Sequence, residues 1–288
     1  MSESHYELID FGGGRKLERF GKFMIDRPCP AADAAKPLTS LWDSTDLYFE
    51  LTDNHQGNWH SPSNRFNPDE KFITDWGFAS LELACSPFGH LGVFPEQKTN
   101  WDWVRESREL LNGHDVLNLF GYTGAMSLAL ADCGALVTHV DSAKNIVKRA
   151  RANAQRSGLQ DAPIRWIVDD ARKYVQREIK RERRYRAIYL DPPTFGHGAN
   201  GEVWKIDRDL PELIEDSTGL LEQNFFDFLL TCHSPGYNQR RLEEVCQPVI
   251  DLGKGIFTSK TSGELCLTDR NQRKLNCGYF VSVSCRIH

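Results

Sequence analysis

The chain has 288 residues, of which 40% are hydrophobic and 26% are charged, with 35 Lys and Arg against 40 Asp and Glu. This globular composition excludes disordered, collagen-like and fibrous chains. The net charge of −5 argues against non-specific coating of nucleic acid but allows an enzyme that meets RNA through one local patch. The apolar stretches are too short to span a bilayer, and the first residues lack a signal-peptide pattern, so the cytoplasm is the expected location.

Eight cysteines are spread along the chain, and the closest two, Cys277 and Cys285, lie eight residues apart without a C-x-x-C pair. A structural zinc site usually needs clustered ligands, and disulfide frameworks are typical of much shorter chains. The pattern therefore predicts free thiols and no bound metal.

Residues 1–95 differ from the rest of the chain. They contain three consecutive glycines at 12–14, a stretch rich in proline and alanine at 28–37, and three tryptophans among short mixed segments. Short strands joined by turns are the expected content, with 28–37 either a linker or a long surface loop. We expect 1–95 to form a β-rich N-terminal extension and 96–288 to form a separate domain.

From about residue 97 onward, apolar runs of strand length alternate with helical stretches. The predicted strands are 115–120, 135–140, 164–168, 187–190 and 226–231, followed by two closing antiparallel strands at 255–267 and 278–285. The predicted helices are 125–133, one that Ser142 caps and that ends near Ser157, a basic helix after 170, 210–221 and 240–252. This alternation indicates an α/β fold with a doubly wound, mostly parallel sheet.

Polar or glycine-rich segments follow the first four predicted strands. They are Gly121-Tyr122-Thr123-Gly124, Asp141, Asp169-Asp170 and Asp191-Pro192-Pro193. In such sheets ligands bind beyond the carboxyl ends of the strands, so we expect all four segments on one ligand-binding rim. The competing interpretation treats these aspartates as ordinary strand-end turns and helix caps.

The spacing of the rim residues favours a particular ligand. Glycines after the first strand let the backbone approach a ligand, and Asp141 follows Gly121 by twenty residues, where a carboxylate can accept two ribose hydroxyl bonds. A nicotinamide dinucleotide needs a third glycine for its pyrophosphate, which this loop lacks. S-adenosylmethionine has the adenosine half without phosphate. Asp170 suits its adenine amino group, and the prolines after Asp191 fix the backbone beside its sulfonium.

Three motifs resemble a known family: 118–124 (Asn-Leu-Phe-Gly-Tyr-Thr-Gly), 140–142 (Val-Asp-Ser) and 190–195 (Leu-Asp-Pro-Pro-Thr-Phe). They resemble the class I methyltransferases related to the bacterial large-subunit ribosomal RNA cytosine-C5 methyltransferases. Residues 92–97 look like the segment before the core in a poorly characterised branch of that group without a PUA domain. The resemblance covers about 85–285 and implies a Rossmann-like methyltransferase core.

The same resemblance implies the site residues. Asp191, Pro192 and Pro193 border the methyl group and are the candidate catalytic residues. The implied cofactor-binding residues are Gln97, Asn118, Phe120, Gly121, Tyr122, Thr123, Gly124, Asp141, Ser142, Asp170, Ala171 and Asp191.

Two positions depart from that group's pattern. Thr194 stands where its better-known members carry Lys or Arg, and Ser234 stands where they carry the cysteine that attacks cytosine C6. Cys232 lies two residues earlier, which moves its thiol by about 6–7 Å along a strand. Because cytosine C5 needs a thiolate partner, we predict transfer without a covalent cysteine. His233 is then either a base or an end-of-strand polar residue.

The stretch 172–186 carries eight basic and two acidic residues, and it has two interpretations. It is either an RNA footprint or the solvated face of a helix whose buried stripe is Ala171, Tyr174, Val175 and Ile179. The prediction for the whole chain is an S-adenosylmethionine-dependent methyltransferase with RNA as the expected acceptor. A nicotinamide oxidoreductase and a non-catalytic binding module are the alternatives. The oligomeric state is open, and a homodimer is compatible with the sequence.

Overall fold

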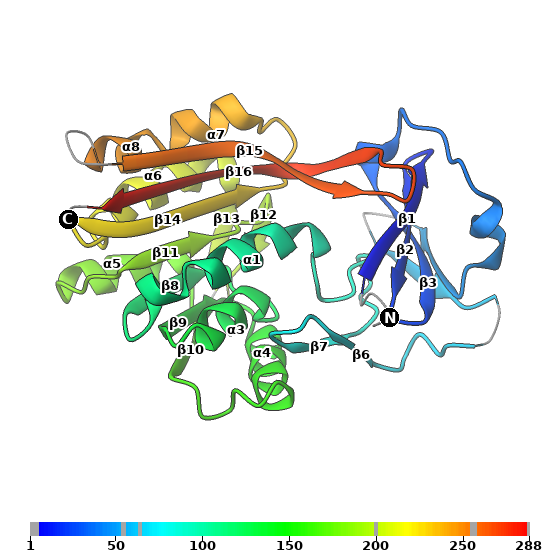
Figure 1. Cartoon of the computed structure of the whole chain (residues 1–288), viewed down its shortest axis with the longest axis horizontal. Helices are drawn as coiled ribbons and strands as arrows, with labels where there is room; N and C mark the ends of the chain where they lie inside the picture. The colour runs from blue at the N-terminus through cyan, green and yellow to red at the C-terminus, as the bar shows by residue number, and fades with distance from the viewer. Residues whose placement is uncertain (1–5, 53–55, 63–64, 199–200, 254–257, 287–288) are drawn as a thin grey trace. The chain divides into compact units, whose positions relative to one another are not determined.

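The computed structural model describes residues 6–52, 56–62, 65–198, 201–253 and 258–286, and Figure 1 labels its elements. Residue contacts divide the chain into two compact units. The first comprises Met1–Lys98 and Cys266–Cys277, and the second comprises Thr99–Leu265 and Gly278–His288. The sequence assigned 266–277 to the domain 96–288, whereas the contacts group these residues with the first unit. In the described part of the chain, no helix is long and apolar enough to cross a membrane.

The first unit is rich in β-structure, as its sequence predicts. Its main sheet has the order β1-β2-β3-β4-β5, and β6 pairs with β7. The strands are β1 Tyr6–Gly12, β2 Arg15–Phe20, β3 Phe23–Pro28, β4 Leu47–Leu51, β5 Gly57–His60, β6 Phe72–Asp75 and β7 Ser80–Leu83. The short 3₁₀ helices are η1 Pro30–Ala32, η2 Ser40–Ser44 and η3 Pro95–Gln97. Gly13 donates to the carbonyl of Ala35 at 3.0 Å, so 28–37 is a loop that folds back on the glycine turn and not a linker.

A buried carboxylate ties residues 266–277 to the first unit. Asp10 is fully buried, accepts a hydrogen bond from the indole Nε1 of Trp42 at 2.8 Å, and pairs with Arg273. The guanidinium of Arg273 also pairs with Asp269 at 2.7 Å. This cluster joins residues from opposite ends of the sequence, which explains why the sequence pattern alone did not group them.

The second unit contains a sheet with the strand order β10-β9-β8-β11-β14-β16-β15, which Figure 1 shows from its lower to its upper edge. The strands from β10 to β14 pair in parallel, and β16 pairs antiparallel with β14. Their bounds are β8 Asp115–Leu119, β9 Leu136–Asp141, β10 Ile164–Val168, β11 Ala187–Leu190, β14 Phe225–Cys232, β15 Thr258–Thr268 and β16 Lys274–Arg286. The predicted α/β fold with a mostly parallel sheet is confirmed.

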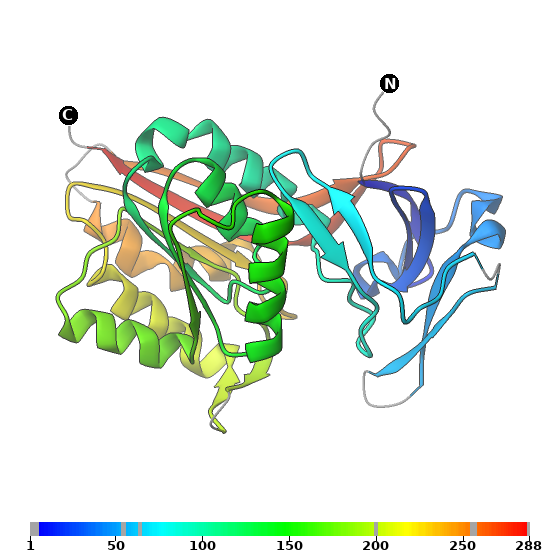
Figure 2. The same ribbon diagram turned by 90° about the horizontal axis from the view of Figure 1, so that it is seen from below.

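Helices cover both faces of this sheet, and Figure 2 shows them on its two sides. They are α1 Lys98–Glu106, α2 Arg108–Leu111, α3 Ala125–Asp132, α4 Lys144–Arg156, α5 Ala171–Lys180, α6 Ile206–Thr218, α7 Gln239–Val245 and α8 Gln247–Leu252. One apolar cluster packs α5 to α8 on the sheet through residues such as Leu117 and Ile188. A second cluster packs α1, α2 and α3 on the other face through Val116 and Tyr189. Neighbouring positions on a strand thus face opposite layers, as in a doubly wound fold.

Two local predictions were wrong, and one hairpin was missed. The N-cap of α4 is Ala143, and the hydroxyl of Ser142 instead donates to the carbonyl of His197 at 3.4 Å. The predicted helix 240–252 is two helices, because Pro248 has no N–H to donate and therefore stands in the first turn of α8. A hairpin of β12 (Phe195–His197) and β13 (Val203–Lys205) follows the predicted Asp-Pro-Pro turn and was not expected.

The basic stretch 172–186 lies on α5 and the residues that follow it. Its buried face contains the predicted residues Ala171, Tyr174 and Val175, together with the carboxylate of Glu178. Most of its basic side chains have a carboxylate partner: Arg172–Asp209, Lys173–Glu202, Arg177–Asp169, Arg181–Glu178 and Arg186–Glu222. This pairing neutralises the stretch locally and favours the solvated helix face over an RNA footprint.

Candidate active site

The turn after β8 has an unusual backbone. Phe120 and Tyr122 have φ angles of 55° and 49°, and Gly124 has a φ of 94°. A residue with a side chain in this region costs about 1–3 kcal/mol, so the surroundings must hold the turn in place. Part of that support comes from the end of β9, because the backbone N–H of Tyr122 donates to Oδ2 of Asp141 at 2.9 Å. The turn and the carboxylate therefore form one structure.

Asp141 is held from both sides. Its second oxygen, Oδ1, accepts the backbone N–H of Ala143 at 2.9 Å. Burial raises the pKa of this carboxyl, and the two backbone hydrogen bonds act against that shift. Each oxygen keeps a lone pair beyond its backbone bond, so the carboxylate can still accept hydrogen bonds from a ligand.

A buried polar chain lies beneath the turn. Asn118 donates its side-chain N–H to Oγ of Ser127 at 2.9 Å, and that oxygen lies 2.9 Å from Nδ1 of His139. His139 is fully buried, and burial lowers its pKa to about 3, so the ring is neutral. A Cβ on Gly121 would lie 2.4 Å from this ring. Only glycine allows the turn to rest on His139.

The end of β10 provides Asp169 and Asp170. Asp170 is 9% exposed and caps α5, because its carboxylate accepts the backbone N–H of Lys173 at 3.1 Å. Ala171, the first residue of α5, is buried. Although carboxylates line this edge, the described residues contain no group of three or more His, Cys, Asp or Glu arranged to hold a metal ion.

The Asp191-Pro192-Pro193 segment follows β11. Oδ1 of Asp191 accepts the hydroxyl of Thr231 at 2.6 Å and lies 3.3 Å from Nε2 of His233. The carbonyl of Pro193 accepts the indole N–H of Trp204 at 2.6 Å. That indole also lies against the ring of Phe120, with 4.9 Å between the ring centroids. Trp204 therefore links the turn after β8 to the segment after β11.

The end of β14 carries the two residues that depart from the family pattern. Cys232 is 1% exposed, and burial raises the pKa of its thiol. Ser234 is 5% exposed, and its hydroxyl lies 2.8 Å from that of Thr194. The thiol is protonated at neutral pH, and one of the two hydroxyls donates a hydrogen bond to the other. Neither residue is prepared to act as a nucleophile.

The second unit thus brings nearly all the predicted site residues to the carboxyl edge of adjacent strands. Gln97 is the exception, because it lies in η3 and belongs to the first unit, where it is buried. Sequence reasoning missed Ser127, His139, Thr231 and Trp204 as supporting residues. The one available signal was a histidine in the middle of the apolar strand β9.

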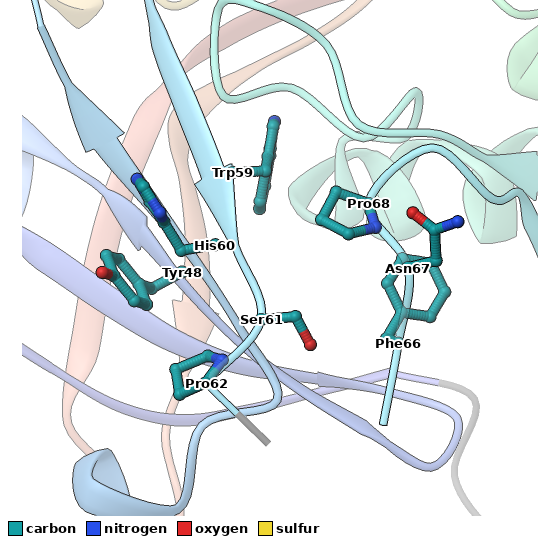
Figure 3. A pocket seen from close by; sticks show the side chains of 8 residues that line it. All are labelled: Tyr48, Trp59, His60, Ser61, Pro62, Phe66, Asn67 and Pro68. Atoms are coloured by element: carbon teal, nitrogen blue, oxygen red, sulfur yellow. The ribbon is translucent and has the colours of Figure 1, made fainter. Parts of the chain in front are cut away.

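A separate pocket of about 640 Å³ lies within the first unit, and Figure 3 shows its lining. Tyr48 and His60 stack there with ring centroids 4.8 Å apart. The indole N–H of Trp59 is already used, because it donates to the carbonyl of Ser86 at 2.8 Å. The pocket contains none of the predicted cofactor residues.

A family model described as S-adenosylmethionine-dependent methyltransferase matches residues 79–227. The chain belongs to this family. The sequence left a nicotinamide dinucleotide as the alternative to S-adenosylmethionine. The family match decides between them, and S-adenosylmethionine is the cofactor of this methyltransferase.

Solved structures agree with this assignment. The SAM-dependent methyltransferase of Agrobacterium tumefaciens is 33% identical and superposes with a TM-score of 0.90 over 98% of this chain and 91% of its own. A methyltransferase structure from Streptococcus mutans is 18% identical, with a TM-score of 0.76 over 99% of this chain and 76% of its own. The first likeness supports the family, and the second shows the fold.

Curated relatives include the ribosomal RNA large subunit methyltransferases K/L of two Shewanella species. The S. frigidimarina protein is 29% identical over 53% of this chain, and the S. loihica protein is 30% identical over the same share. The methyltransferase aligns with only 21% of the length of either relative.

Proposed function

We propose that this methyltransferase transfers a methyl group from S-adenosylmethionine to a nitrogen atom of an RNA base. The aligned relatives are named as methyltransferases of ribosomal RNA, which supports RNA as the acceptor. The observation that carries the proposal is the rim itself, where the turn 120–124, Asp141, Asp170 and Asp191 occupy the ends of four adjacent parallel strands.

The cofactor contacts follow from the groups that remain available on this rim. The ribose hydroxyls donate to Asp141, whose oxygens each keep a lone pair beyond one backbone bond. The turn 120–124 presents its backbone to the methionine part, and the capping carboxylate of Asp170 takes the adenine amino group. Asp191 and Pro192 border the transferred methyl. In this proposal Asn118 supports the turn through Ser127.

The choice of a nitrogen acceptor rests on the end of β14. Methylation at cytosine C5 requires a thiolate that first adds to C6. Cys232 is buried with a raised pKa, and Ser234 is paired with Thr194. A nitrogen lone pair can attack the methyl carbon without that activation, so catalysis comes mainly from alignment of the two reacting atoms.

A labelling experiment tests the proposal. The purified chain is incubated with S-adenosylmethionine carrying a tritiated methyl group, together with total RNA in one reaction and total protein in another. We expect label in RNA, and nucleoside analysis should place it on a ring or exocyclic nitrogen. Label in protein alone would overturn the RNA acceptor, and label at cytosine C5 would overturn the nitrogen acceptor.

A further inference from the structure

The hairpin of β12 and β13 follows the Asp-Pro-Pro segment directly, and its base is fixed to the rim. The backbone N–H of Ile206 donates to the carbonyl of Thr194 at 3.1 Å, and the hydroxyl of Thr194 lies 2.8 Å from that of Ser234. A hairpin of two strands is marginally stable by itself in water, so it needs an anchor. Trp204 provides it, because its indole is 4% exposed and donates to the carbonyl of Pro193.

The two faces of this hairpin have different surroundings. A Cβ on Gly196 would lie 3.7 Å from Pro193 and 3.9 Å from its cross-strand partner Trp204, so this face is turned toward the rim. Successive residues of a strand point to opposite faces, so Phe195 and His197 point away from Pro193. The yellow-green hairpin projects from the second unit at the bottom of Figure 2, which leaves the outer face open.

This outer face carries an exposed aromatic pair and a cation. The ring of Phe195 is 51% exposed and meets that of the exposed His197 edge to face, with 4.9 Å between the centroids. Lys205 pairs with Phe195 across the hairpin and is also exposed. Its ammonium forms no ion pair with any residue that the structure describes. Nearby carboxylates have cations of their own: Glu202–Lys173, Asp207–Arg241 and Asp209–Arg172.

We propose that the outer face of the hairpin binds a nucleotide next to the methyl acceptor in the RNA. The base of this nucleotide stacks on Phe195, and its phosphate contacts the ammonium of Lys205. The inference rests on the proposed function. Because Phe195 points away from Pro193, the stacked base is a neighbour of the target base and not the target itself.

Aromatic stacking suits the charge of this chain. With a net charge of −5, the protein attracts phosphates only through local cations, whereas the stacking of a base on an aromatic ring does not depend on the overall charge. A base can stack on a side chain only when it is unpaired and splayed out of a helix. The inference therefore narrows the RNA acceptor to a single-stranded segment, such as a loop or a bulge.

Phe195→Leu tests the stacking, because it keeps an apolar side chain and removes the ring face. The probe is a fluorescein-labelled single strand of twelve adenosines, measured by fluorescence anisotropy with S-adenosylhomocysteine present. We expect its affinity to fall about 10-fold, within the range for the loss of one stacked base. Phe195→Tyr keeps the ring and should retain most of the affinity. S-adenosylhomocysteine should bind all variants equally in calorimetric titrations.

The matched control is Phe88→Leu. Phe88 is 55% exposed and belongs to the first unit, so the same substitution removes a ring of similar exposure outside the hairpin. The affinity of this variant for the adenosine strand should equal that of the unchanged protein. A duplex of the same strand with its uridine complement should bind more weakly, and Phe195→Leu should not change that binding, because paired bases cannot stack on the ring.

Lys205→Gln tests the phosphate contact. The slope of log affinity against log salt for the adenosine strand should become shallower by about 0.7, the value for one contact with a single strand. Lys205→Arg keeps the charge and should keep the slope. An unchanged slope in Lys205→Gln would overturn the phosphate contact.

The kinetics of methyl transfer separate this role from one in the chemical step. A flanking nucleotide is bound equally before and during the transfer, so its loss should raise KM without lowering kcat. In the tritium assay with total RNA, Phe195→Leu should raise KM about 10-fold, in line with one lost stacked base. A fall in kcat at unchanged KM would overturn the inference.

The remaining outcomes distinguish this inference from the proposed function. If the unchanged protein labels RNA and Phe195→Leu has equal RNA affinity and KM, the nucleotide site is overturned and the proposed function stands. If the unchanged protein labels protein alone, the proposed function fails and the inference fails with it. A loss of labelling by Phe195→Leu with intact ribosomal particles but not with protein-free RNA would make the outer face a protein contact, which also overturns the inference.

Discussion

The two halves of the rim are built in different ways. At β8 and β9, the turn 120–124 is held by the backbone N–H of Tyr122, which donates to Asp141, and by its close approach to the buried ring of His139. At β11 and β14, the contacts are between side chains. Thr231 and His233 contact the carboxylate of Asp191, and the hydroxyl of Thr194 lies beside that of Ser234. The first half thus depends on backbone donors and on the close approach that Gly121 allows, whereas the second depends on the identity of paired side chains. We therefore propose that the cofactor is held mainly by the first half and that the acceptor lies at the second.

The largest effect is expected from Gly121→Ala. The new Cβ would lie 2.4 Å from the ring of His139, and a fully buried ring has nowhere to move. We expect the affinity for S-adenosylhomocysteine to fall about 100-fold and the free energy of unfolding to fall by about 1–3 kcal/mol, the usual cost of overpacking. Calorimetric titration and chemical denaturation measure the two quantities.

The matched control for this change is Gly196→Ala on the other half of the rim. A Cβ there would lie 3.7 Å from Pro193 and 3.9 Å from Trp204, which are ordinary contacts. Its cofactor affinity should stay within about twofold. Adding His139→Ala to Gly121→Ala should recover part of the lost affinity, because the two groups are in contact and their effects are not additive. Undiminished binding by Gly121→Ala would remove the distinction between the halves.

Asp141→Ala should weaken cofactor binding by about 1.5–3 kcal/mol, the range for a hydrogen bond to a charged group. An ordinary aspartate has a pKa of about 3.9. Because burial raises the pKa of Asp141, its carboxylate becomes protonated at a higher pH than that of an ordinary aspartate. Affinity in the unchanged protein should therefore decline early on acidification, and Asp141→Asn should not show that decline. Titrations at several pH values check this. The folded state holds the proton more tightly than the unfolded chain, so this group's own contribution to folding weakens as pH rises.

The sequence predicted the strands of the rim better than the side-chain contacts that support it. Strand 187–190 agrees with β11, and the segments after the four strands were placed on one edge, because apolar runs that end in Gly or Asp depend only on local pattern. The chain from Asn118 through Ser127 to His139 was out of reach, since it depends on how α3 packs on β8 and β9. Helix 240–252 failed because Pro248 opens a new helix as readily as it ends one.

The same limit applies at larger distances. The bond between Asp10 and Arg273 joins residues 263 positions apart, and no periodicity in the sequence records it. The contact of His233 with Asp191 is similar, because it follows from the parallel register of β11 and β14. Sequence reasoning could name His233 as a base or a polar strand end, but it could not supply its partner.

Cys232→Ala should have a small effect that is confined to stability. The thiol is 1% exposed with a raised pKa, so its loss leaves a small cavity and costs about 1 kcal/mol of unfolding free energy. Methyl transfer should remain within twofold of the unchanged protein. RNA that contains 5-fluorocytosine should form no covalent adduct, as denaturing electrophoresis would show. An adduct at Cys232 would mean that the acceptor half works through a thiolate after all.

The smallest effect is expected for the basic stretch on α5, away from both halves of the rim. Replacing Arg181, Arg183 and Arg184 with Gln removes three charges, two of which lie within 4.0 Å of Glu178. If all three contacted phosphates, the slope of log affinity for single-stranded RNA against log salt would become shallower by about 2, at about 0.7 per contact. We expect a change below about 0.5, because Arg181 and Arg183 already lie beside the carboxylate of Glu178. The melting temperature should fall slightly, since Glu178 then keeps the hydroxyl of Tyr185 at 2.6 Å but loses its cations. A slope change near 2 would instead make α5 part of the RNA-binding surface, and the acceptor would then be held from outside the rim as well as within it.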